Sequence, residues 1–350
     1  MSHRTDIASD QSSDQVPHDV FMPLFSEGWH TRAVLEGLCF HTKVRSIHIA
    51  APAEPIERLK PVVESWNCAP ITFHWEDTFF GVDLLSKAKL FERLNAIPEL
   101  YQPGWFYQQL LKFGAQEIIT SLSDWTLIWD SDLIILGGWP FFINDIPAFA
   151  LLQDRSAGNA DIVASWRGWI NDTLGVEAIE DARGTFIPHH MWFYRPAIQE
   201  LLNRFQGEDR HWTQSVIDSV ATHKSFSEYW AVASWMKAHF SKALAYHPYE
   251  VAGATTERFF DDGRGLFTQA FSQWHERQIG KKPRRFPSYD SILSFVKHEY
   301  GEERIPSSLS LEGSERHIRK NIANRHVEEL RSRWLVTEKE AAELGISLGQ

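Results

Sequence analysis

The segment Trp125–Asp132 constrains this chain more than any other, because an uncharged run of β-branched and aromatic residues ends abruptly in two carboxylates. The run Trp125–Trp129 predicts a buried strand, and Asp130 and Asp132 follow it two residues apart. Side chains at this spacing in an extended chain point to the same side, so both carboxylates can face one ligand. Ionised carboxylates at the end of a buried strand need a group that neutralises them.

The position of this pair indicates what its ligand is. Open α/β sheets bind ligands at the carboxyl ends of their parallel strands, where a hard divalent cation is the usual partner of paired carboxylates. Asp130 and Asp132 therefore predict a site for a divalent cation that carries a phosphate-bearing substrate. The alternative is an ordinary solvated turn, because chance Asp-x-Asp pairs are common in a chain with 46 acidic residues.

Strand-like and helix-like segments alternate through the first 130 residues, which predicts βαβ units and a mostly parallel sheet flanked by helices. The expected strands are Val20–Phe25, Ser46–Ala50, Ile71–Trp75 and the strand before Asp130. The expected helices are Thr31–Thr42, Ile56–Trp66, Leu84–Leu94 and Trp105–Ile119.

The second half of the chain is less regular. Its strand-like segments are Phe149–Leu152, Ile162–Trp166, His190–Tyr194 and Ala243–His247, and its helix-like segments are Pro196–Phe205, His211–Ala221 and Ser227–Phe240. We expect a disordered tail over residues 1–17, one α/β domain over 18–270, and a helical C-terminal extension over 271–350.

Composition excludes several classes of protein. The formal net charge of −11 argues against a general nucleic-acid binder, which usually carries a basic face. Two cysteines, Cys39 and Cys68, are too few for a disulfide scaffold or a cysteine-built zinc site, and they suit a reducing cytosol. The sequence shows no apolar run of membrane-spanning length and no signal peptide, so we expect a cytoplasmic protein.

A basic cluster, Lys281–Arg285, interrupts the C-terminal region. It suits a peripheral contact with anionic lipid heads at the inner face of the membrane, or with an acidic glycan. The alternative is a solvated linker.

The helix Trp105–Ile119 carries a second candidate group. Gln109 and Lys112 are three residues apart and Gln108 and Lys112 four apart, so each pair shares a helix face. Because a lysine ammonium is a point charge for phosphate, the group predicts contacts with a nucleotide or its phosphates. The alternative is an ordinary solvated helix face.

Four segments give this chain a resemblance to nucleotide-sugar glycosyltransferases of the GT-A type. They are Gly104–Lys112 (GWFYQQLLK), Trp129–Asp132 (WDSD), His189–Phe193 (HHMWF) and Phe226–Tyr229 (FSEY). In order and rough spacing they resemble, more narrowly, the DUF6492 family of bacterial proteins, often linked to surface polysaccharide genes. The resemblance implies a Rossmann-like GT-A domain and transfer of a sugar from a UDP- or GDP-sugar to a hydroxyl on a glycan, lipid-linked oligosaccharide or small molecule.

The resemblance also implies a metal site. Asp130 and Asp132 would hold Mn²⁺ or Mg²⁺ against the donor diphosphate, with Asp132 as the main direct ligand and Asp130 also contacting the donor. A late histidine often completes such a site, and His247 at the end of the last expected strand is the candidate. A lone histidine is by default a structural residue, which is the alternative for His247.

The same resemblance suggests a catalytic base and two sugar contacts. An inverting enzyme needs a carboxylate that takes the proton of the acceptor hydroxyl, and Glu228 is the candidate, ahead of Asp218 and Glu76. Stabilisation by a helix N-terminus is a sufficient structural reason for Glu228. His189 and His190 would hydrogen-bond donor or acceptor hydroxyls, or else mark only a packed strand edge.

Two other functions remain open at this level. A nucleotidyltransferase would use the same Asp-metal site, but it normally needs a Gly-rich phosphate loop after the first strand, and Phe25–Gly28 is a poor one. A catalytically inactive, GT-A-like carbohydrate-binding or scaffold protein is the other, and the intact pair Asp130 and Asp132 argues against it.

Overall fold

A five-stranded sheet forms the centre of the computed structural model, which describes residues 16–311 except 101, 139–140, 144, 152–159, 182–185, 187, 249–255 and 259–260. Most of the expected N-terminal tail and the end of the expected extension lie outside these residues. In spatial order the strands are β3 (Ile71–Trp75), β2 (Val44–Ala51), β1 (His18–Pro23), β4 (Trp125–Trp129) and β8 (His190–Tyr194).

The first four strands of this sheet are parallel, and β8 runs antiparallel to β4. The order 3-2-1-4 is that of a Rossmann-type half-sheet, whose ligands lie beyond the carboxyl ends of the strands. Residues Val20, Phe21 and Met22 of β1 are fully buried, as a central strand covered on both faces must be.

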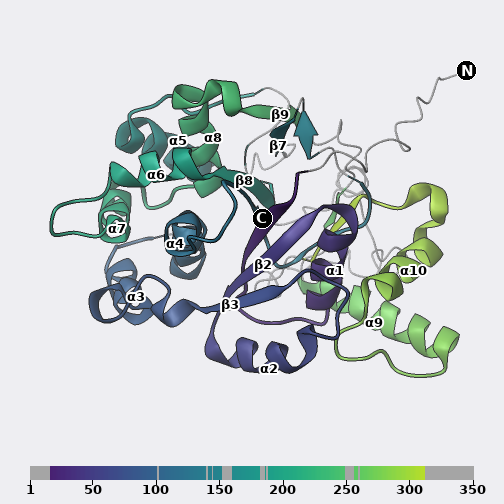
Figure 1. Ribbon diagram of the computed structural model, residues 1–350. Coiled ribbons are helices and arrows are strands. Elements are labelled where there is room, and N and C mark those ends of the chain that lie inside the picture. Colours follow the sequence, from purple (N-terminus) through teal and green to yellow (C-terminus); the bar gives the residue numbers. More distant parts are fainter. Residues whose placement is uncertain are drawn as a thin grey trace, which may run out of the picture.

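Helices cover both faces of the sheet (Figure 1). On one side lie α1 (Thr31–His41), α9 (Asp261–Ile279) and α10 (Tyr289–Tyr300), and on the other α3 (Lys87–Asn95), α4 (Pro103–Ile118) and α7 (Trp212–His223). Helix α2 (Ala53–Val63) connects β2 to β3. The predicted fold class, a mostly parallel sheet flanked by helices, is confirmed.

The remaining elements follow β4. Helices α5 (Ala160–Trp169), α6 (Arg195–Asn203) and α8 (Glu228–His239) lie beside the antiparallel edge of the sheet (Figure 1). One small sheet joins β10 (Thr256–Arg258), β11 (Ser308–Ser310) and β5 (Leu133–Ile135), and another joins β6 (Phe142–Ile143), β7 (Ile146–Leu151) and β9 (Ala245–Pro248). Short 3₁₀ turns occupy Glu76–Thr78, Asp83–Leu85, Ser241–Ala243 and Glu302–Arg304, and a π turn, Ile170–Leu174, continues α5.

The prediction of a strand at Ile162–Trp166 is wrong, because this segment belongs to α5. Trp166 Nε1 donates to Ser225 Oγ at 2.8 Å, and Trp169 Nε1 donates to Ser219 Oγ at 2.9 Å. The two indoles are three residues apart and donate to partners on the same side of α5, which is the spacing of one helix face. A short apolar run does not distinguish a strand from a buried helix by itself.

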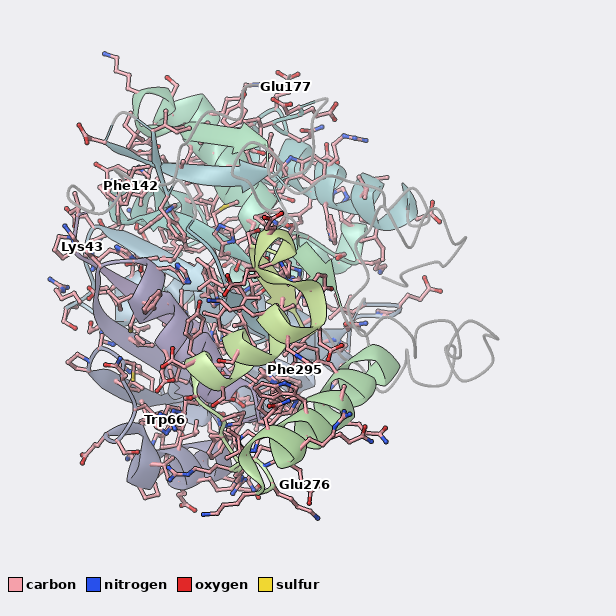
Figure 2. The ribbon with its side chains drawn as sticks, turned by 90° about the vertical axis from the view of Figure 1, so that its right-hand side faces the viewer. Lys43, Trp66, Phe142, Glu177, Glu276 and Phe295 are labelled. Atoms are coloured by element: carbon pink, nitrogen blue, oxygen red, sulfur yellow. The ribbon has the colours of Figure 1, made fainter. Side chains whose placement is uncertain are left out.

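The C-terminal region packs directly on the rest of the chain. Phe295 of α10 lies against α9 (Figure 2), with its ring 5.2–5.6 Å from the rings of Phe267, Phe271 and Trp274. Residue 270, where the sequence suggested a domain boundary, falls within α9, and the division of the chain there stays a prediction. No helix within the described part of the chain is long and apolar enough to cross a membrane.

Candidate functional site

The turn that carries Asp130 is fixed at the carboxyl end of β4. Trp129 Nε1 donates to the carbonyl oxygen of Leu133 at 2.9 Å and so spans the turn. The backbone N–H of Asp130 donates to the carbonyl oxygen of His189 at 2.9 Å. The turn is therefore tied both to the start of β5 and to the residue that precedes β8.

A buried polar stripe runs along α4. Gln109, Lys112 and Gln116 are at most 3% exposed and recur at the spacing of one helix face. Gln116 Nε2 donates to Thr126 Oγ1 and to the carbonyl oxygen of Phe193, both at 3.0 Å, which locks the helix onto β4 and β8. The alternative of a solvated helix face is wrong for Gln109 and Lys112.

Lys112 stands at the centre of the site. Its Nζ lies 2.7 Å from Asp130 Oδ1 and donates to Glu228 Oε1, also at 2.7 Å, while the ring of Tyr229 lies 4.3 Å away. Burial favours the neutral amine, but the charges of Asp130 and Glu228 outweigh it and raise the pKa of Lys112 well above 10.5. The site thus contains a permanent buried ammonium charge.

Asp130 has a polar contact on each carboxylate oxygen. Tyr229 donates its hydroxyl to Oδ1 at 3.3 Å, beside Lys112, and His189 Nδ1 lies 3.6 Å from Oδ2. Burial opposes ionisation, but the charge of Lys112 and the contact with His189 lower the pKa of Asp130 below its usual value. Asp130 is therefore an ionised, oriented carboxylate.

Glu228 opens α8 and faces Lys112. Ser227 Oγ accepts from the backbone N–H of Trp230 at 3.4 Å, and Gln109 Oε1 accepts from the backbone N–H of Glu228 at 2.9 Å. Burial raises the pKa of Glu228, more than the neighbouring Lys112 lowers it. With a side chain only 3% exposed, Glu228 is held as an internal partner of Lys112, and its role as a base stays a prediction.

Five residues proposed from the sequence meet in this Lys112 cluster, namely Gln109, Lys112, Asp130, His189 and Glu228. The sequence missed Tyr229, which contacts both Lys112 and Asp130. The sequence did contain a signal for Tyr229, because this residue directly follows Glu228 in the segment Phe226–Tyr229 on which the resemblance rests.

The other proposed residues lie differently. Gln108 is half-buried on a neighbouring face of α4, and within the described residues no hydrogen bond joins it to the Lys112 cluster. His190 points away from His189, as adjacent strand residues do, and its ring packs 5.0 Å from Trp129 and 6.1 Å from Phe141. Donor contacts by Gln108 and His190 stay predictions.

The predicted metal ligands are only partly described. Asp132 is half-buried, and its carbonyl oxygen accepts from the backbone N–H of Leu311 at 2.9 Å. His247 lies in β9 opposite Ala150, and its side chain is outside what the structure describes. Among the described side chains, no group of three His, Cys, Asp or Glu is placed to hold a metal ion.

The weaker candidates for a base are engaged elsewhere. Asp218, on α7, forms ion pairs with Arg93 and Arg210. Glu76, in the turn after β3, forms an ion pair with Lys87. Each carboxylate has a basic partner of its own, and among the described contacts neither joins the Lys112 cluster.

No family model and no curated protein sequence matches this chain. Similar solved structures include apo mouse xyloside xylosyltransferase 1, with 11% identity over 84% of this chain and 97% of that one, at a TM-score of 0.41. Galactosyltransferase LgtC with donor and acceptor sugar analogues has 11% identity, coverage of 71% and 78%, and a TM-score of 0.36. Glycosyltransferase GlyE of Streptococcus pneumoniae TIGR4 has 12% identity, coverage of 91% and 63%, and a TM-score of 0.35. Likenesses at this level assign neither family nor activity, and the resemblance to DUF6492 proteins stays a prediction.

Proposed function

We propose that this chain is a GT-A-type glycosyltransferase that moves a sugar from a UDP- or GDP-sugar to a hydroxyl acceptor. One observation carries the proposal. The four segments on which the sequence resemblance rests are far apart in the chain, yet each contributes one residue to a single cluster. These residues are Lys112, Asp130, His189 and Glu228. The cluster lies beyond the carboxyl end of β4, where a sheet of this order binds its ligands.

The chemistry of the cluster suits a diphosphate leaving group. Lys112 and the turn Asp130–Asp132 form a charged edge that is held by an ion pair and by backbone hydrogen bonds. Preorganised charge of this kind stabilises a transition state in which negative charge develops on the leaving phosphate. We propose that the donor diphosphate lies against the turn Asp130–Asp132, with the buried Gln109 and Lys112 holding this edge in position from the protein interior.

The residues present suit a cation that is shared with a substrate. Mg²⁺ and similar ions are commonly held by one or two carboxylates together with substrate phosphates, without a full protein cage. Asp132 would be the principal ligand, because Asp130 already faces Lys112, and Asp130 and His247 would complete the set. When bound, the ion would supply further stabilisation of charge on the leaving diphosphate.

The proposed base is Glu228. Burial raises the pKa of this carboxylate, which makes it a better proton acceptor for the acceptor hydroxyl in an inverting reaction. In a retaining reaction the leaving phosphate takes the proton, and Glu228 would only orient Lys112. The pH dependence of kcat in Glu228→Gln separates the inverting from the retaining reaction. If Glu228 is the base, the decrease of kcat at low pH should disappear in this variant.

A thermal-shift screen of UDP, GDP, CDP and dTDP, each with and without Mn²⁺, tests the proposed function. A ligand that binds only the folded state raises its stability by mass action. We expect metal-dependent stabilisation by one nucleotide, lost in Asp132→Ala and kept in Asp124→Ala, whose carboxylate is 75% exposed before β4. No shift with any nucleotide contradicts the proposal.

Turnover then separates the remaining functions. Release of the bound nucleotide from its sugar conjugate, or transfer of the sugar to an added acceptor, is the expected result. Binding without turnover would instead identify an inactive GT-A-like carbohydrate-binding or scaffold protein. Formation of a sugar nucleotide from a nucleoside triphosphate and a sugar phosphate would identify a nucleotidyltransferase.

We also propose a peripheral contact of the basic loop with the inner face of the membrane. Lys281, Lys282 and Arg284 are exposed, while Arg285 anchors the loop by donating to Glu27 Oε1 at 2.7 Å. Pelleting with anionic vesicles that is lost when Lys281, Lys282 and Arg284 are neutralised would support this contact. Absence of pelleting by the wild-type protein would contradict it.

A further inference from the structure

The C-terminal region returns to the strand that directly follows Asp132. Strand β11 lies between β10 and β5, with Leu309 opposite Ile134 and Ser310 opposite Leu133. The carbonyl oxygen of Ser307 accepts from the backbone N–H of Leu136 at 2.7 Å and from that of Gly137 at 3.0 Å. Residues 170 or more positions apart in the chain are thus joined next to the Asp130–Asp132 turn.

This segment also touches the Lys112 cluster. The backbone N–H of Leu311 donates to the carbonyl oxygen of Asp132, and Ser310 Oγ lies 3.4 Å from His189 Nε2. The opposite ring nitrogen, His189 Nδ1, is the one that faces Asp130 Oδ2. Ser310 is fully buried, so this hydroxyl is enclosed with the histidine ring that it contacts.

Helix α10, which precedes this segment, is attached to α1. The backbone N–H of Tyr289 donates to Glu36 Oε2 at 2.8 Å, and the Tyr289 hydroxyl lies 2.7 Å from His41 Nε2. Gly37 of α1 leaves room for the tyrosine ring, because a Cβ there would lie 3.1 Å from Tyr289 Cδ2. Tyr289 thus attaches the start of α10 to α1, while β11 is placed by its pairing with β10 and β5.

We propose that Ser310 is a positioning residue, which orients His189 and through it the Asp130 carboxylate. When the Nδ1–H of a neutral imidazole faces a carboxylate, the other nitrogen accepts a hydrogen bond, and the Ser310 hydroxyl is placed to donate it. Asp130 is then held by Lys112 on one oxygen and by His189 on the other. The effect of this positioning on catalysis rests on the proposed function.

Three substitutions test the positioning role of Ser310. Ser310→Ala removes the hydroxyl, Ser310→Thr keeps it on a residue that suits a strand, and Ser308→Ala removes a buried hydroxyl two positions away in β11. For Ser310→Ala we expect kcat for the sugar nucleotide to fall about tenfold with an unchanged KM. This is the effect expected when a residue of the site loses the hydrogen bond that orients it. Ser310→Thr should restore the rate, and Ser308→Ala should leave it unchanged.

A second readout does not depend on activity. The ¹⁵N shifts of the His189 ring, assigned with His189→Gln, should change in Ser310→Ala and remain as in the wild type in Ser308→Ala. Unchanged ring shifts and kcat in Ser310→Ala would overturn the positioning role of Ser310. An equal loss of kcat in Ser310→Ala and Ser308→Ala would also overturn it. If the wild-type protein binds no nucleotide, the proposed function fails, while the ring shifts still decide whether Ser310 orients His189.

Discussion

The ammonium nitrogen of Lys112 lies 2.7 Å from Oδ1 of Asp130, so the chain itself supplies the first cation that neutralises this strand-end carboxylate. The sequence suggested a divalent ion for that task. Lys112 lies eighteen positions before Asp130, and the sequence pattern did not show that its helix turns this side chain inward. A buried ion pair of this kind gives little net stability when intact, but removal of one partner leaves an uncompensated buried charge.

Replacement of Lys112 should therefore destabilise the protein strongly. In Lys112→Met the carboxylates of Asp130 and Glu228 remain buried without their shared cation, and we expect a loss of about 3–5 kcal/mol in the free energy of unfolding at pH 7. Urea unfolding measures the loss. The matched control is Lys89→Met, whose ammonium pairs with Glu92 at the surface and should cost less than about 1 kcal/mol. Similar losses in both variants would contradict the central role of Lys112.

Most of the sheet could be predicted because its strands are short apolar runs bounded by turn residues. Ile71–Trp75 and His190–Tyr194 have the bounds that the sequence predicted. Hydrophobic pattern does not reveal three-residue strands such as β5 and β11, whose pairing depends on contacts between distant parts of the chain. The attachment of the C-terminal region to the Asp130–Asp132 turn was therefore beyond sequence reasoning.

The choice between Gln108 and Gln109 could have been made from the sequence. Phe106, Leu110 and Phe113 are fully buried and define the inner face of α4. Gln109 lies three residues after Phe106 and four before Phe113, so it shares that face, whereas Gln108 does not. The spacing to Lys112 alone permitted either residue. Apolar periodicity thus carries information on which polar residues a helix buries.

The packing of α4 gives a second prediction. A Cβ at Gly114 would lie 2.4 Å from Phe80 Cε1, a side chain that is itself buried, so Gly114→Ala should cost about 1–3 kcal/mol by overpacking. Gly104→Ala, in the first turn of the same helix, meets nothing within 4 Å and should leave stability unchanged or raise it slightly. Urea unfolding of both variants makes the comparison, and equal effects would contradict the packing argument.

A histidine pair on β2 and β3 predicts a pH dependence of stability. His48 Nδ1 and His74 Nε2 lie 3.0 Å apart, and burial lowers the pKa of His48 below 6.5 and that of His74 to about 4. Below pH 6.5 the unfolded chain binds protons that the folded pair does not, so stability present above that pH is lost as the pH falls towards 4. We expect His74 to account for about 1 kcal/mol between pH 7 and pH 5, since His74 is half-exposed and screened.

The matched variants are His74→Gln and His275→Gln. The first should make the decline in unfolding free energy between pH 7 and pH 5 shallower, because it removes one of several histidines whose burial lowers the pKa, among them His18, His41 and His48. The second replaces a half-buried histidine on α9, outside this pair, and should keep the wild-type slope. An unchanged slope in His74→Gln would show that this pair does not govern acid stability.

Tyr229 provides the last test of the Lys112 cluster, because its ring and its hydroxyl have separate partners. The ring lies 4.3 Å from Lys112 Nζ, and the hydroxyl donates to Asp130 Oδ1 at 3.3 Å. Tyr229→Phe keeps the ring and should cost about 1 kcal/mol for one lost hydrogen bond. Tyr229→Leu also removes the cation–π contact and should cost about 2 kcal/mol more, since the ammonium is buried. Urea unfolding ranks the variants, and a Phe variant as unstable as the Leu variant would show that the hydroxyl, not the ring, holds the cluster together.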